Sequence, residues 1–106
     1  MTDLIANILC GAAARAGLPF PSRVDCIDGH LSVHTNPTTL DQWRAWCDLV
    51  AVDRDTETTK TAGFTYAKGS YRGYPVLLYG HGVPKLRYAA RLAAGEDLPP
   101  FGSPLT

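Results

Sequence analysis

Residues 23–34 read Arg-Val-Asp-Cys-Ile-Asp-Gly-His-Leu-Ser-Val-His, and this stretch carries the clearest structural signal in the chain. An Asp-Gly pair between two runs of alternating residues is typical of a two-residue type I′ hairpin turn, because both central residues of that turn need a positive φ. A turn at Asp28-Gly29 fixes the strand register and places Val24 opposite Val33. The predicted core face holds Val24, Cys26, Leu31 and Val33, and the opposite face, which is solvated or an interface, holds Arg23, Asp25, Ile27, His30, Ser32 and His34.

Helices are predicted on both sides of this hairpin. Residues 3–16 are apolar almost throughout, and Gly17 is a typical residue to end a helix. Residues 38–41 resemble a capping box, which opens a second helix. That helix carries an apolar stripe at steps of three and four residues, namely Leu40, Trp43, Cys47 and Val50. A third helix begins near Pro84 and is closed by Gly95.

A second strand pair is predicted at residues 64–66 and 76–79, joined around residues 68–70. Gly73 and Pro75 in the return strand favour a bulge or an edge position. The polar run 53–59 is expected to be a solvated loop or the frayed start of a strand. The order α-β-β-α-β-β-α favours an α+β fold, with an antiparallel four-stranded sheet of two hairpins and helices on one face. Residues 1–95 form the single domain, and residues 96–106 form a Pro-rich C-terminal tail.

The length and composition are those of one globular domain. The 106 residues can bury a single core without metal or disulfide staples. No apolar run approaches the roughly 18–20 residues that a membrane-spanning helix needs. The three cysteines are odd in number and form no C-x-x-C pair, and the first residues carry no positively charged leader. The sequence therefore predicts a cytosolic protein, and nothing in it points to a cofactor.

The leading hypothesis is a small non-enzymatic homodimer that binds another macromolecule in a regulatory role. The first helix is too apolar to have only one buried face, and the two tryptophans and five tyrosines belong to residue types that concentrate at interfaces. A protein partner or a nucleic acid fits this hypothesis, and a membrane does not. Because histidine titrates near neutral pH, histidines at the interface predict pH-sensitive association. The candidate dimer contacts are Leu4, Ile5, Ile8, Ile27, His30 and His34.

A second hypothesis follows from the uneven distribution of charge. Residues 1–57 hold four basic and eight acidic side chains, whereas residues 58–95 hold six basic side chains and no acidic one. All five tyrosines lie in that basic stretch, and cations interleaved with aromatic rings suit a phosphate backbone and its bases. The stretch 58–95 is therefore a candidate nucleic-acid-binding module. Its candidate nucleic-acid or anion surface is Tyr66, Lys68, Arg72, Tyr74, Lys85, Arg87 and Arg91.

A third hypothesis is a small-ligand or anion-binding protein, or an enzyme, with its site near His81 and Lys85. Residues 79–85 predict a strand, a glycine turn and a helix start, and free N–H groups at such a terminus can hold an anion. The sequence does not match a P-loop, and Pro84 removes one donor. A bound ligand or a concave pocket near these two residues is the observation that would favour this hypothesis.

Two further constellations receive little support from the sequence. Ser32, His34 and Asp25 could supply a nucleophile, a base and an orienting group, but Ser32 and His34 are about 6–7 Å apart along one strand. A metal site at Cys26, His30 and His34 is disfavoured because Cys26 points to the other face and the histidines are about 13 Å apart. The sequence therefore identifies no catalytic residue and no metal ligand.

Three segments give the chain a family resemblance. They are residues 31–34 (Leu-Ser-Val-His), the helix with Leu40 and Trp43, and residues 71–76 (Tyr-Arg-Gly-Tyr-Pro-Val). With these segments the chain resembles short Ala- and Arg-rich proteins of high-GC actinobacteria and their phages, most of them of unknown function. The resemblance covers residues 23–80. It implies a stand-alone cytosolic protein and transfers no site residue.

Overall fold

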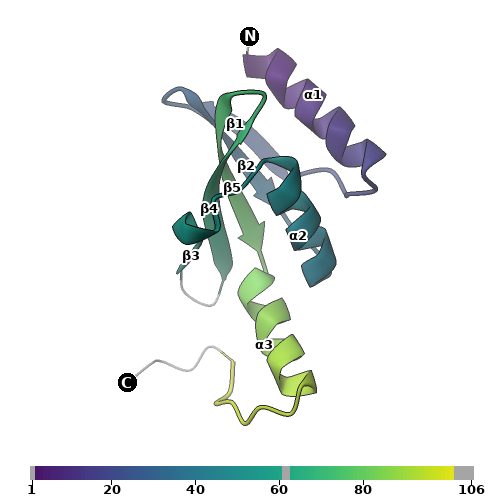
Figure 1. The fold of residues 1–106 in the computed structure, drawn as a ribbon, viewed down its shortest axis with the longest axis vertical. Helices are drawn as coiled ribbons and strands as arrows, with labels where there is room; N and C mark the ends of the chain where they lie inside the picture. The colour runs from purple at the N-terminus through teal and green to yellow at the C-terminus, as the bar shows by residue number, and fades with distance from the viewer. Residues whose placement is uncertain (1, 61–62, 102–106) are drawn as a thin grey trace.

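The structure is a computed structural model, and it describes residues 2–60 and 63–101. Its elements follow the order α-β-β-α-β-β-β-α. They are α1 (Thr2–Arg15), β1 (Arg23–Ile27), β2 (His30–Thr35), α2 (Leu40–Leu49), β3 (Thr58–Lys60), β4 (Phe64–Tyr71), β5 (Tyr74–His81) and α3 (Val83–Ala93), with a short 3₁₀ helix η1 (Arg54–Thr56) before β3. Figure 1 shows α1 and α2 along one side of the sheet, whereas α3 extends beyond the lower end of β5.

The strands form one mixed sheet in the order β1-β2-β5-β4-β3, in which β2 and β5 are parallel. The prediction of an antiparallel four-stranded sheet is therefore wrong. One reason is β3, which lies in the polar run expected to be a loop and pairs with β4 at the sheet edge. The other reason is that the chain leaves β2 through α2 before it returns to the sheet, and such a crossover brings strands back in parallel.

The first hairpin is confirmed in turn type and in register. Asp28 has a φ of 50° and Gly29 a φ of 82°, as a type I′ turn requires. Val24 pairs with Val33, and Cys26 pairs with Leu31. Leu31 and Val33 are buried in the core and Val24 packs against it, as predicted, but Cys26 is exposed and Ser32, on the opposite face, is buried.

The second hairpin turns four residues later than predicted. Residues 68–70 belong to β4, and the turn is Arg72-Gly73, with φ values of 51° and 78°. The expected bulge is wrong, because the register between β4 and β5 is continuous, and β5 is a central strand that has a neighbour on only one side at Pro75. The pairing partner of Pro75 in β4 is Ser70, and pairing of β5 with β2 begins only at Val76. Proline has no backbone N–H group to donate to a neighbouring strand. At Pro75 this causes no loss, because β2 does not pair with β5 at this position.

The core lies between the sheet and the helices α1 and α2. It contains Leu9 and Ala13 of α1, Trp43, Trp46 and Cys47 of α2, and Leu31, Val33, Val76 and Leu78 of the central strands. The ring of Trp43 packs directly on the backbone of Gly80, where a Cβ atom would come within 2.6 Å of the ring. A larger residue at position 80 would push α2 away from the sheet.

The helix boundaries follow local signals. Gly17, with a φ of 77°, ends α1, and the Leu18 N–H donates to the Ala13 carbonyl at 2.9 Å. Thr39 caps α2 by accepting a hydrogen bond from the Gln42 N–H at 3.1 Å. After α3, the chain folds back on the helix, since the Tyr88 hydroxyl donates to the Pro99 carbonyl and the Tyr88 ring contacts Phe101. Residues 102–106 of the predicted tail lie outside the described residues.

Candidate functional site

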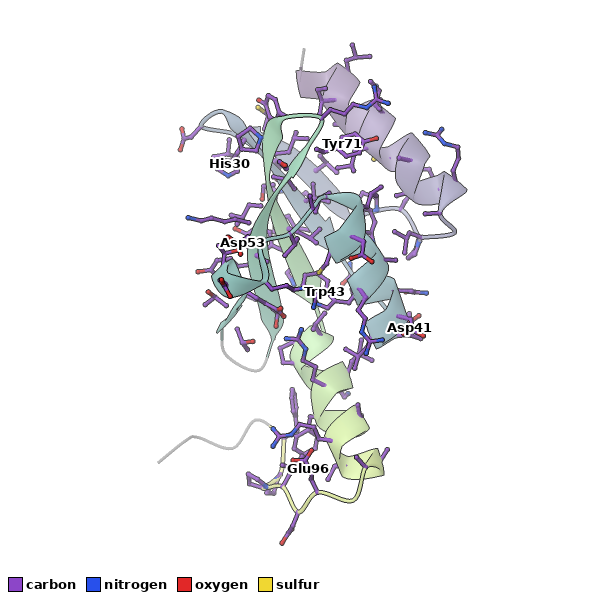
Figure 2. All side chains as sticks on the ribbon, viewed as in Figure 1. His30, Asp41, Trp43, Asp53, Tyr71 and Glu96 are labelled. Carbon is purple, nitrogen blue, oxygen red and sulfur yellow. The ribbon has the colours of Figure 1, made fainter. Side chains whose placement is uncertain are left out.

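The face of the sheet opposite α1 and α2 carries a second set of side chains. Strand alternation sends Leu31, Val33, Val76 and Leu78 into the core, so the residues between them point the other way. Among the described residues, none of the three α-helices lies across this face (Figure 1). Figure 2 shows His30 on this side of the sheet and Trp43 on the other. We call it the uncovered face.

A chain of three polar side chains lies on the uncovered face. The Ser32 Oγ is 3.3 Å from the His34 Nε2, and the His34 Nδ1 is 2.9 Å from the His81 Nε2. Ser32 and His34 are two residues apart on β2, so they share a face. His81 joins them because His34 is in register with Tyr79 on the parallel strand β5, two residues before His81. We call this set the Ser–His–His chain.

Aromatic rings hold the middle imidazole of this chain in place. The His34 and Tyr79 rings are stacked, with centroids 4.3 Å apart and planes within 2° of parallel. The His81 ring lies edge to edge with the His34 ring, with centroids 5.2 Å apart and planes within 15° of parallel. Phe64 lies 5.7 Å from Tyr79 and 5.5 Å from His81, and Tyr66 lies 5.8 Å from Tyr79. The stacking leaves His34 little freedom to change its orientation.

The surroundings of His34 favour its neutral form. Its pKa is lowered from the ordinary value of 6.5, first by burial and then by the positive charges that His81 and Arg23 can carry. Asp25 acts in the opposite direction and only partly offsets these effects. Arg23 and Asp25 also form an ion pair with each other, which weakens the influence of both on His34. At neutral pH, His34 is therefore an uncharged imidazole that can accept a proton.

A hollow of about 440 Å³ opens on the uncovered face beside the Ser–His–His chain. It is lined by His30, Lys68, Gly69, Pro75, Val76 and Leu77. His30 precedes Ser32 by two residues on β2, and Leu77 is the register partner of Ser32 on β5. Ser32 is a sheet neighbour of these residues, but it is only 3% exposed and is not among the residues that line the hollow.

The candidate dimer residues do not form one surface. On α1, Ile5 packs against the core while Leu4 is 58% exposed and Ile8 is partly buried. Ile27 is exposed at the end of β1, His30 lies on the uncovered face (Figure 2), and His34 lies on the same face because it alternates with the core residue Val33. Because α1 packs on the other side of the sheet, the α1 residues of this set and the two histidines lie on opposite sides of the sheet.

The candidate nucleic-acid residues are likewise dispersed. Tyr66 and Lys68 lie on the uncovered face, but Tyr74 points to the helix side, where its hydroxyl is 3.6 Å from the Cys26 thiol. Arg87 forms an ion pair with Glu57, and Arg91 forms one with Glu96 at 3.0 Å. Arg72 lies in the hairpin turn beside the Tyr71 ring, and Lys85 is exposed on α3.

The predicted site at His81 and Lys85 is brought together only in part. His81 belongs to the Ser–His–His chain, and no hydrogen bond or ion pair links it to Lys85 in the part of the chain that the structure describes. The helix start is also less open to an anion than the sequence indicates, because the Gly82 N–H already donates to the Gly63 carbonyl at 2.9 Å.

The sequence predicts Asp25 as the third group beside Ser32 and His34, and it predicts that the two β2 residues lie too far apart to meet. The structure corrects both points: their side chains meet although their backbones are two residues apart, and the third member is His81. The signal that could have found His81 is the apolar run Val76-Leu77-Leu78, which is typical of a central strand in a parallel pair. Within residues 2–60 and 63–101, no group of three His, Cys, Asp or Glu side chains could hold a metal ion.

Comparison of the chain with protein-family models, with curated proteins and with solved structures finds no match. None of the described helices has the length and apolar character needed to cross a bilayer.

Proposed function

We propose that this protein binds a small amphipathic molecule, one with an apolar chain and an anionic or carbonyl head group, in the hollow on the uncovered face. The observation that carries the proposal is the hollow itself. Its volume of about 440 Å³ lies in the usual range for small-molecule sites, and such sites combine an apolar lining with a few polar groups. Neither His81 nor Lys85 lines the hollow, so this proposal concerns a different site from the one predicted near those two residues.

The lining indicates the chemistry of the ligand. Pro75 and Leu77 provide apolar surface for a chain, and Lys68 and His30 provide hydrogen-bond donors for a head group. Among the described side chains, Lys68 has no acidic partner within ion-pair distance. Its ammonium group is therefore available to a carboxylate. The three free cysteines suit a reducing compartment, so we place this binding protein in the cytosol.

Titration with octanoate, followed by ¹H–¹⁵N NMR, tests the proposal. We expect chemical-shift changes at the amides of residues 30–32, 68–69 and 76–77, which surround the hollow. Octanol provides the matched neutral ligand. Lys68→Met should weaken octanoate binding by up to about fivefold, as expected for a partly exposed ion pair, and should leave octanol binding unchanged.

Lys85→Met is the control variant, because Lys85 is an exposed cation on α3 away from the hollow. It should leave the binding of both ligands unchanged. Absence of shift changes at millimolar octanoate, or changes confined to other parts of the chain, would overturn the proposal. In that case the homodimer and the nucleic-acid module, which stay predictions, become the hypotheses to test next.

A further inference from the structure

We infer that the uncovered face binds a single-stranded nucleic acid through a cluster of five aromatic rings. These rings, which we call the ring cluster, belong to His34, Phe64, Tyr66, Tyr79 and His81. None of the five lines the hollow, so the inference does not depend on the ligand proposed above. Only Tyr66 belongs to the nucleic-acid surface that the sequence predicts, so the site is a different one.

Strand pairing builds the ring cluster. His34 is in register with Tyr79, and Tyr79 is in register with Tyr66, so a ladder of three rings crosses β2, β5 and β4. Phe64 is in register with His81, and this pair lies beside the ladder on the same face. Rings that are already held in place lose little conformational freedom when a base stacks on them, which favours binding.

The ladder has two ends at which a base can stack. Tyr79 lies in the middle, with its ring parallel to that of His34 and tilted by 37° to that of Tyr66. The next register position beyond Tyr66 is Thr58, and the one beyond His34 is Arg23, so neither end carries a further ring. All five rings of the cluster are half-buried, so each keeps exposed surface. A planar base on Tyr66 or His34 therefore continues the ladder.

The charges on the sheet suit a phosphate backbone. Asp25 is the sole acidic residue within the bounds of the five strands, and Arg23 forms an ion pair with it. Lys68 is exposed two residues after Tyr66 on the same face, and among the described side chains it has no acidic partner within ion-pair distance. Asp53 lies at the sheet edge, where its carboxylate caps η1. A cation beside a stacking ring can hold a phosphate and its base together.

A surface of this kind selects single strands. The bases of a duplex are stacked on one another, so a ring on a protein surface has no access to their faces. The bases of a single strand are free to leave their own stack and to lie on a protein ring instead. RNA and DNA share this chemistry, and they differ in the 2′-hydroxyl group.

Fluorescence anisotropy with three labelled probes tests the inference. The probes are an oligouridylate and an oligothymidylate of about twelve nucleotides, within the usual size of a single-strand site, and a DNA duplex of the same length. At roughly 50 mM salt we expect a single strand to bind with a Kd below about 100 μM and at least about tenfold more tightly than the duplex. Tighter binding of the RNA or of the DNA identifies which of the two the face prefers.

Tyr66 provides the test of stacking, because it lies at one end of the ladder. Tyr66→Ala should weaken single-strand binding at least about fivefold, and Tyr66→Phe should keep the wild-type affinity because a phenyl ring also stacks. Tyr88→Ala is the matched control, since Tyr88 is a half-buried tyrosine of α3 outside the sheet. It should leave binding unchanged. The ¹H–¹⁵N spectrum of each variant should keep the dispersion of the wild-type spectrum, which shows an intact fold.

The salt dependence of binding provides the test of Lys68. Each phosphate contact on a single strand contributes about 0.7 to the slope of log K against log salt concentration. Lys68→Gln should therefore lower the magnitude of that slope by about 0.7. Lys85→Gln, which removes an exposed cation of α3, should leave the slope unchanged.

Several results would overturn the inference. They are the absence of single-strand binding at low salt, equal affinity for the duplex, and an equal loss of affinity in Tyr66→Ala and Tyr88→Ala. A dimer in sedimentation that Tyr66→Ala dissociates, without binding of either single strand, would assign the face to a second copy of the chain. Octanoate binding should persist in Tyr66→Ala, because Tyr66 does not line the hollow, so this inference and the proposed function can fail separately.

Discussion

His34 and His81 are 47 positions apart in the sequence, and their Nδ1 and Nε2 atoms lie 2.9 Å apart in the folded chain. The contact depends on the parallel pairing of β2 with β5. This pairing places His34 beside Tyr79, and His81 follows Tyr79 by two residues on the same face of β5. A hydrogen bond between two imidazoles requires one nitrogen to donate and the other to accept. The pair is therefore intact only when at least one of the rings is uncharged.

The first prediction concerns the protonated nitrogen of His34. We expect the neutral imidazole to carry its proton on Nδ1, because that tautomer donates to His81 and leaves Nε2 free to accept from Ser32. Long-range ¹H–¹⁵N spectra of the side chain at pH 8 report the tautomer directly. The His81→Ala variant should show a mixture of tautomers. A protonated Nε2 in the wild-type protein would contradict the prediction.

The second prediction concerns stability as the pH falls. The pKa of His34 is lowered by burial and by His81 and Arg23, so the folded chain binds this proton less readily than the unfolded chain. Below about pH 6.5 the unfolded state gains the proton first, and the free energy of unfolding decreases. Urea denaturation at pH 8 and pH 5.5 measures the loss. In His34→Gln the loss should be smaller, and an equal loss in both proteins would contradict the assignment.

The third prediction compares two glycines. Gly80→Ala should lower the free energy of unfolding by about 1–3 kcal/mol, since the new Cβ would meet the Trp43 ring and the Val83 side chain at 2.6 Å. Gly11→Ala should raise it by up to about 1 kcal/mol, because Gly11 lies within α1 and its Cβ would meet only the end of the Arg15 side chain at 3.4 Å. Equilibrium denaturation measures both, and a change of the same sign in the two variants would contradict the packing described.

The fourth prediction concerns the order in which the thiols react. Cys26 is exposed and should react first with iodoacetamide at pH 8. Burial raises the pKa of Cys10, and burial raises the pKa of Cys47 to about 11, so both hold little thiolate at that pH. Mass spectrometry of peptides over a time course gives the order. Cys47 reacting as fast as Cys26 would show that α2 detaches from the sheet.

Local features of the fold could be predicted from local sequence. The Asp28-Gly29 turn follows from the need for two positive φ values, and no other part of the chain is required to specify it. The end of α1 at Gly17 has the same local origin. The turn at Arg72-Gly73 cannot be predicted in the same way, because Arg72 is an unusual first residue for a turn with two positive φ values, and Gly69 is a competing turn residue in the sequence.

The strand order and the candidate site depend on contacts that are distant in sequence. Nothing local to β2 indicates whether it pairs with β5 or with β4, because either pairing would bury Leu31 and Val33. His34 contacts His81 only because β2 pairs with β5. From residue type alone, His30 and His34 belong to the predicted dimer contacts, Lys68 to the predicted nucleic-acid surface and His81 to the predicted ligand site. The pairing of β2 with β5 brings them onto one face of the sheet.

The parallel pairing of β2 with β5 also has a consequence for the order of folding. Each hairpin closes over a two-residue turn, and hairpins of this kind form within microseconds. The junction between the hairpins must wait for segments some forty-five residues apart to meet, which is slower because a long loop has to close. The Ser–His–His chain spans this junction, so we expect it to be assembled after both hairpins. A ligand bound beside it would hold the two halves of the sheet together.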